Sequence, residues 1–195
     1  MDCFIALGSN MPRDRQTPAD VISHALWHFA GQGLEILQQS EFYRIPAHPP
    51  GSTPDLISAA VHVRSDKSPD GIIECLARIE AALGRPVRNG TDRYTIDLEL
   101  VAAVALVLPD EITVREAMSM EPEPDMLGIA PKGGAVLPHP RLHVRPDVLV
   151  PLAAIAPDWR HPVIGASPEE MLSGLDRNAV VSVEALGEIP PFTLG

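Results

Sequence analysis

Residues 56–84 read LISAAVHVRSDKSPDGIIECLARIEAALG, and this stretch combines a strand with the helix that follows it. The first eight residues are mostly apolar, which is typical of a buried strand. Ser68 and Pro69 then provide a helix N-cap and a first-turn proline, and Gly84 provides the end of the helix. The apolar residues between them recur on one helical face, at Ile72, Ile73, Leu76, Ile79 and Leu83. A strand that leads into an amphipathic helix indicates a domain in which helices pack on a sheet.

The segments on either side of this unit extend the pattern. Upstream, residues 3–7 predict a strand, 18–33 an amphipathic helix and 34–43 a second strand. Downstream, residues 95–108 predict a fourth strand with a bend near its middle. The order strand, helix, strand, strand, helix, strand predicts one α+β domain over residues 1–195, with a ferredoxin-like sheet and its helices on one face.

The last part of the chain reads as shorter elements. Residues 148–155 and 167–175 predict short helices, and 179–183 predict a final strand. Between them and the fourth strand, residues 109–138 are rich in Pro, Met, Glu and Gly and predict a long loop. Such a loop is either a lid that closes over a ligand or a permanently packed insertion.

Composition limits the class of protein. The chain has 195 residues, 45% of them hydrophobic, and none of its apolar runs approaches the length of a membrane span. Its formal net charge of −11 argues against a nucleic-acid partner, which requires a basic surface. Cys3 and Cys75 are the two cysteines, and no basic region precedes an apolar stretch at the N-terminus. We therefore expect a cytoplasmic protein with reduced thiols.

The segment 94–100, YTIDLEL, contains two carboxylates that predict a metal site. Side chains alternate along a strand, so Asp97 and Glu99 share one face. Two carboxylates so placed repel each other unless a cation lies between them, and hard oxygen ligands at this spacing suit Mg²⁺. A solvated strand face explains an isolated Asp-x-Glu equally well, so the rest of the chain must decide.

Several short motifs, in order along the chain, resemble the 6-hydroxymethyl-7,8-dihydropterin pyrophosphokinase family of folate biosynthesis. They lie at 6–10 (ALGSN), 42–44 (FYR), 54–61 (PDLISAAV), 78–85 (RIEAALGR), 95–99 (TIDLE), 137–142 (LPHPRL) and 151–158 (PLAAIAPD). Each motif is short, but together they cover most of the chain.

The resemblance implies ATP-dependent transfer of diphosphate to the hydroxymethyl group of a dihydropterin, with ATP as co-substrate and two Mg²⁺ ions held by Asp97 and Glu99. It gives catalytic roles to Asp97, Glu99 and Arg85. The expected nucleotide-binding residues are Glu80, Arg88, Arg93, His139 and Arg145. The expected pterin-binding positions are Gly8, Ile45, Ser58 and Asp147. The chain has neither a P-loop nor a Rossmann glycine motif, so ATP is expected to bind in another way.

The chain departs from the family pattern at several of these positions. Glu99 stands where the family has an aspartate, and Tyr94 where it has an arginine. Ser58 and Asp147 replace an asparagine and a phenylalanine that contact the pterin. Three functions therefore stay open: the family's reaction, the same chemistry on a different pterin-like alcohol, or a degenerate paralogue that binds a ligand or partner without turnover. The paired carboxylates and His139 favour an enzyme.

Overall fold

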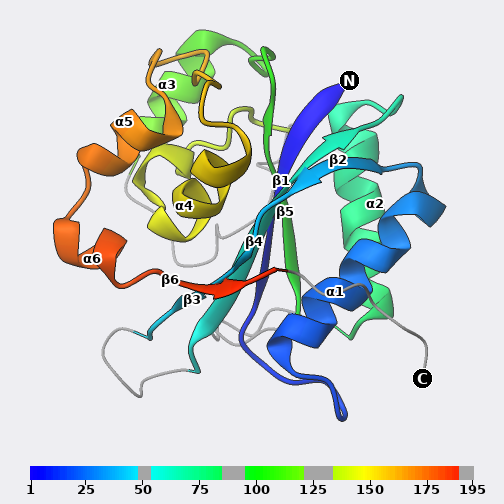
Figure 1. Ribbon diagram of the computed structural model, residues 1–195. Coiled ribbons are helices and arrows are strands. Elements are labelled where there is room, and N and C mark those ends of the chain that lie inside the picture. Colours follow the sequence, from blue (N-terminus) through cyan, green and yellow to red (C-terminus); the bar gives the residue numbers. More distant parts are fainter. Residues whose placement is uncertain (48–53, 85–94, 121–133, 189–195) are drawn as a thin grey trace.

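The computed structural model describes residues 1–47, 54–84, 95–120 and 134–188. Three antiparallel strands form the centre of the sheet (Figure 1). β1 (Asp2–Ser9) lies between β4 (Leu56–Arg64) and β5 (Asp97–Ala103) and is antiparallel to both. The first and fourth of the predicted strands are therefore neighbours, as a ferredoxin-like topology requires.

Three shorter strands complete the sheet beyond β4. β2 (Glu35–Gln39) and β3 (Phe42–Ile45) both pair with β4, and β6 (Glu184–Gly187) pairs with the outer side of β3. All the pairings are antiparallel. The predicted α+β sheet with ferredoxin-like order is confirmed.

Helices cover both faces of the sheet, which corrects the expectation that they lie on one face. α1 (Pro18–Phe29), with the 3-10 turn Ala30–Gln32, and α2 (Pro69–Ala82) pack on one face. α4 (Pro146–Ile155) and α5 (Pro168–Ser173) lie on the other face (Figure 1). The reason is that β1 is apolar on both sides, and each apolar face of a sheet must be covered.

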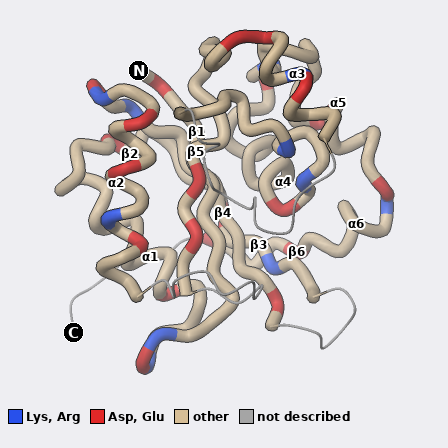
Figure 2. The backbone as a smooth tube through the Cα atoms, turned by 180° about the vertical axis from the view of Figure 1, so that it is seen from behind, with Lys and Arg blue, Asp and Glu red and all other residues tan. Residues whose placement is uncertain are grey.

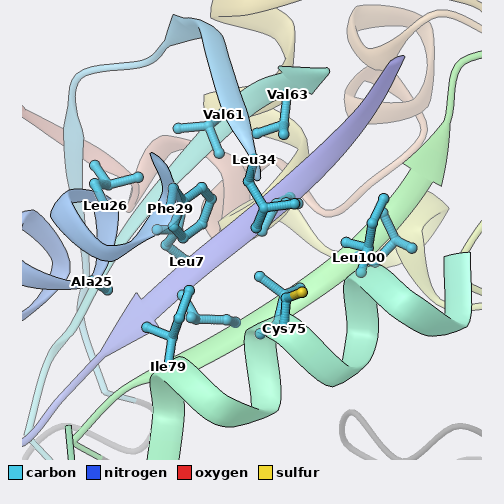
Figure 3. Packing of buried hydrophobic residues seen from close by; sticks show 14 of the residues in the cluster. Leu7, Ala25, Leu26, Phe29, Leu34, Val61, Val63, Cys75, Ile79 and Leu100 are labelled. Carbon is cyan, nitrogen blue, oxygen red and sulfur yellow. The ribbon is translucent and has the colours of Figure 1, made fainter. Parts of the chain in front are cut away.

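The sheet separates two clusters of buried side chains. Phe29, Val61 and Ile79 belong to the larger cluster, between the sheet and α1 and α2 (Figure 3). Phe4, Leu149 and Trp159 belong to the second, beneath α4. The two carboxylates predicted on β5 lie on the α4 side, because the alternate residues Leu98 and Leu100 belong to the larger cluster.

The predicted strand 34–43 is divided into two strands at Ser40. The Ser40 hydroxyl accepts a hydrogen bond from the backbone N–H of Ala60 at 3.0 Å, while the Ser40 backbone N–H donates to the Ala60 carbonyl at 2.9 Å. A side chain thus takes the place of a backbone acceptor at this point of the ladder. The strand direction changes there, and β3 continues as a separate element.

Two further expectations are corrected nearer the C-terminus. The segment 109–138, predicted to be a loop without periodicity, contains the helix α3 (Glu111–Ser119). Asp110 is the N-cap of this helix, and Val114 is its buried residue. Residues 121–133 of that segment lie outside the described residues. The predicted strand 179–183 is wrong, because Asp176 caps the helix α6 (Arg177–Val181) by accepting from two backbone N–H groups. The final strand, β6, comes later.

Two further observations concern membrane-spanning helices and the two cysteines. In the described part of the chain, no helix is both long and apolar enough to cross a membrane. Cys3 and Cys75 are free and buried, and burial raises the pKa of the Cys3 thiol to about 12. The Cys3 thiol is therefore protonated, and both cysteines are packing residues of the larger cluster.

His161 is a buried titratable group in the segment between α4 and α5. Its side chain is 0% exposed, and its Nδ1 accepts a hydrogen bond from the backbone N–H of Val163 at 3.2 Å. Its Nε2 has no hydrogen-bond partner among the described residues. Burial, with a smaller contribution from His143, lowers the pKa of His161 from 6.5 to about 4. The folded protein therefore holds a neutral imidazole at this position.

We predict that this histidine makes the protein less stable in mild acid. A group whose pKa is lower in the folded state contributes stability above its unfolded pKa, here 6.5, and loses it as the pH falls towards 4. Between pH 7 and pH 4 the wild type should lose about 3 kcal/mol more than His161→Asn, whatever the constant cost of the substitution. Denaturant unfolding at several pH values measures this difference. Parallel pH profiles for the two proteins would contradict it.

Candidate active site

The floor of the candidate site is one row of small and acidic residues across three strands. Gly8 on β1 is paired with Asp97 on β5 and with Ser58 on β4. One step further along, Ala6 is paired with Glu99. Because side chains alternate, all five residues face the α4 side of the sheet, and the small residues of β1 leave space above the strand.

The N-terminus of α4 forms the roof over this floor. Arg145 is the N-cap residue of α4, and Asp147 lies in its first turn. The Ser58 hydroxyl donates to the Asp147 carbonyl oxygen at 2.7 Å, which joins β4 to α4. The backbone N–H of His139 donates to the Val101 carbonyl at 2.8 Å and so keeps the preceding turn against β5.

Between floor and roof, Arg145 bridges two carboxylates. Its Nη1 lies 2.5 Å from Oε2 of Glu99, and its Nη2 and Nε lie 2.9 and 3.3 Å from Oδ2 of Asp147. Nε2 of His139 lies 2.9 Å from Oε1 of Glu99, but that oxygen receives no aligned hydrogen bond from the described residues. Figure 2 shows acidic positions on β5 and basic positions beside α4, the two elements that this ion chain connects.

Because Glu99 is buried and Arg145 largely so, the charge of each strongly affects the pKa of the other. The Glu99 side chain is only 9% exposed, and burial alone would raise its pKa. The positive charge of Arg145, with a smaller contribution from the His139 imidazole, outweighs that effect and holds the pKa of Glu99 well below its usual range. Burial likewise opposes the charge of Arg145, but Glu99 and Asp147 together raise its pKa. The site thus keeps the Glu99 carboxylate and the Arg145 guanidinium ionised beneath a helix.

The cavity between these groups is small. Gly8, Asp97, Arg145 and other residues of β1, β4, β5 and α4 surround about 250 Å³ of space between atoms. The part in which a water molecule can sit measures about 10 Å³, which is room for about one water. Among the described residues, the ion chain through Arg145 occupies this space, so a ligand that fills it must displace some of these contacts.

The carboxylates fit a Mg²⁺ site that is completed by a ligand. Asp97 and Glu99 line one cavity, and the buried Oε1 of Glu99 lacks an aligned donor among the described residues. Within the same residues, no group of three or more His, Cys, Asp or Glu side chains could hold a metal ion by itself. Mg²⁺ commonly uses one or two carboxylates together with substrate phosphates and water, so this donor set suits it.

Most of the residues predicted for the site and described by the structure lie together. The structure brings Gly8, Ser58, Asp97, Glu99, Arg145 and Asp147 to one cavity, with His139 against Glu99. Ile45 lies at the end of β3, where it is paired with the cavity residue Leu56. Arg85, Arg88 and Arg93 lie outside the described residues.

Glu80 is placed behind the cavity, on α2. Its buried carboxylate accepts a hydrogen bond from the backbone N–H of Leu98 at 2.7 Å, which joins the helix to β5 directly between the two acidic residues of that strand. This contact positions the strand. The expected role of Glu80 in nucleotide binding stays a prediction.

The sequence interpretation missed four apolar residues of the cavity wall, Ala6, Leu7, Leu56 and Val148. Two of them could have been found from the strand period, because Ala6 lies two residues before Gly8 and Leu56 two residues before Ser58. Val148 depends on how α4 docks, for which the local sequence carries no signal.

Comparison with known proteins gives this site a context. Residues 4–157 match the family model described as 7,8-dihydro-6-hydroxymethylpterin-pyrophosphokinase (HPPK). A similar protein is the 2-amino-4-hydroxy-6-hydroxymethyldihydropteridine pyrophosphokinase of Methylorubrum extorquens, which is 31% identical over 93% of this chain and 98% of its own length. The protein of the same name from Synechocystis is 30% identical over 76% of this chain and 64% of its own length.

A solved structure shares the fold. The chain is similar to that of HPPK-DHPS in complex with substrates, with a TM-score of 0.57 over 88% of this chain and 11% identity. This chain spans 42% of that longer chain. At this identity the likeness concerns the fold alone.

We predict that Arg145→Met destabilises the protein at neutral pH by about 3–5 kcal/mol, because it leaves Glu99 as a buried charge without its main partner. Adding Glu99→Gln should recover part of that loss. The matched control is Arg160→Met, whose partner Glu170 is exposed, and it should cost at most about 1 kcal/mol. Denaturant unfolding measures all four proteins. Equal losses of stability in Arg145→Met and Arg160→Met would contradict the prediction, because the buried ion chain would then contribute no more than an exposed ion pair.

Proposed function

The chain belongs to the 7,8-dihydro-6-hydroxymethylpterin-pyrophosphokinase family of folate-biosynthesis enzymes, and from this premise we propose that its cavity transfers diphosphate from ATP to 6-hydroxymethyl-7,8-dihydropterin. The acceptor hydroxyl oxygen bonds to the β-phosphorus of ATP and loses its proton. The bond from that phosphorus to the oxygen that bridges it to the α-phosphorus breaks, and AMP leaves. The observation that carries the proposal is the convergence of Asp97, Glu99 and Arg145 on one cavity.

We propose that Asp97 and Glu99 hold Mg²⁺, with two ions as the family resemblance implies. When bound, the metal neutralises phosphate charge and orients the triphosphate. The support is that both carboxylates face one cavity and that Oε1 of Glu99 accepts no aligned hydrogen bond from the described residues. The net charge of −11 makes such counter-ions more important for a nucleotide, because the chain as a whole repels anions.

Two nitrogen donors lie beside these carboxylates. Nη1 of Arg145 and Nε2 of His139 are 2.5 and 2.9 Å from the two oxygens of Glu99. Phosphate oxygens beside a metal held by Glu99 come within reach of both groups, and N–H donors there stabilise the negative charge that develops during transfer. A ligand that fills this narrow space would leave little room for water, which would otherwise accept the diphosphate in place of the alcohol.

The acceptor side supports a second candidate, the same reaction on a different pterin-like alcohol. Ser58 donates its hydroxyl to the Asp147 carbonyl, and the Asp147 carboxylate is paired with Arg145. Two positions that would contact the pterin edge and ring are thus occupied by contacts within the protein. A degenerate paralogue is the remaining alternative, but it does not account for the buried Glu99 carboxylate and its ion pair with Arg145, which are costly to maintain.

We propose that the reaction takes place in the cytoplasm. Both cysteines are free and buried, as expected for a protein of a reducing compartment. In the described part of the chain, the structure holds these thiols in the larger core cluster, where each packs as a small apolar residue.

The proposed roles predict that Asp97→Asn lowers kcat by at least about 100-fold without unfolding the protein, because Asp97 faces the cavity and not the core. Phosphorus NMR of MgATP with the dihydropterin measures AMP and the diphosphate ester together. Asp66→Asn, on the exposed turn before α2, is the matched control and should keep the wild-type rate. Wild-type turnover by Asp97→Asn, or turnover that persists after all divalent metal is chelated, would contradict the metal assignment. Product from another alcohol but not from the dihydropterin would favour the second candidate.

A further inference from the structure

The side chain of Arg145 contacts both a proposed metal ligand, Glu99, and a second carboxylate of the cavity, Asp147. Its guanidinium is divided between them: Nη1 lies on Glu99, and Nη2 and Nε both lie on Asp147. The side chains of Arg145 and Asp147 are 19% and 20% exposed, so solvent screens their interaction only in part. Two of the three guanidinium nitrogens are thus held by a residue that is not itself a proposed metal ligand.

We propose that Asp147 is a positioning residue that keeps Arg145 in the cavity and limits its hold on Glu99 when a divalent cation binds there. This inference rests on the proposed role of Glu99 as a metal ligand. A cation that binds Glu99 competes with Nη1 of Arg145, which lies on Oε2, for the charge of the same carboxylate. Because Nη2 and Nε stay on Asp147, the arginine remains beside the metal, with Nη1 directed at its coordination shell and able to donate to a phosphate oxygen.

The local structure fixes the position of Asp147. It lies in the first turn of α4, where a negative charge interacts favourably with the helix dipole. Its backbone carbonyl accepts the Ser58 hydroxyl at 2.7 Å, which fixes this turn against β4. The carboxylate therefore has a defined position from which to orient the guanidinium.

Electrostatics gives the expected direction of the effect. With Asp147 present, Arg145 shares its charge between two carboxylates, so a cation competes with only part of its attraction to Glu99. Without that carboxylate, Arg145 pairs with Glu99 alone, and the cation must overcome a stronger pair. An alternative explanation is that the negative charge of Asp147 attracts the cation directly, and that attraction does not require Arg145. The two explanations therefore differ in their dependence on the arginine.

A double-mutant cycle separates them, with Mn²⁺ alone as the probe and its binding measured by electron paramagnetic resonance in the absence of nucleotide. The four proteins are the wild type, Asp147→Asn, Arg145→Met and the double variant, and circular dichroism checks that each is folded. We expect Asp147→Asn to weaken Mn²⁺ binding about 10-fold when Arg145 is present and about 2-fold or less when it is absent. Arg145→Lys provides a second background if the methionine variant does not fold, because one ammonium cannot bridge both carboxylates in the same way.

The controls distinguish failure of this inference from failure of the proposed function. Glu170→Gln, which removes the partner of the exposed Arg160, should leave Mn²⁺ binding unchanged. Equal losses from Asp147→Asn with and without Arg145, or no loss, would overturn the positioning role while leaving the metal site in place. Mn²⁺ binding that is unchanged in Asp97→Asn would overturn the metal site and this inference together.

Discussion

A carboxylate buried under the N-terminus of a helix needs a cation, and the site described above is organised around that need at Glu99. Arg145 supplies the positive charge from the helix, and His139 adds a second nitrogen at the other oxygen. The arginine in turn is held by Asp147, whose turn is fixed to the sheet by Ser58. One buried charge thus connects β4, β5 and α4 through polar contacts at the place where the sheet opens into a cavity.

The same contacts explain why the cavity is narrow in this structure. Without a ligand, the positive groups that would face a phosphate are used to neutralise Glu99, and little more than one water fits beside them. A metal ion and a nucleotide bring equivalent charges of their own, so they can replace the internal pairs rather than add to them. The apo site is stabilised by the interactions that substrate binding must exchange.

Local patterns in the sequence predicted most of the fold and the shared face of Asp97 and Glu99, whereas the other expected site residues came from the family resemblance. The alternation in 94–100 placed Asp97 and Glu99 on one face, and the capped, periodic helix after Ser68 was found at its observed position. The break at Ser40 was missed because it depends on a side chain that bonds across to β4. The contact between Arg145 and Glu99 joins residues 46 positions apart and exists only after α4 has docked on the second face of the sheet. Helices were expected on one face of the sheet only, and no local pattern shows that α4 docks on the other face, so this contact could not be predicted.

The most direct test of the account is the position of the metal in a ligand complex. Crystals grown with Mn²⁺ and a non-hydrolysable ATP analogue would locate the ion by its anomalous scattering. We predict a metal at about 2.1 Å from oxygens of both Asp97 and Glu99, with Nη1 of Arg145 moved from Glu99 to a phosphate oxygen and its Nη2 still on Asp147. A metal bound elsewhere, or an arginine still paired with Glu99 while the nucleotide is bound, would contradict it.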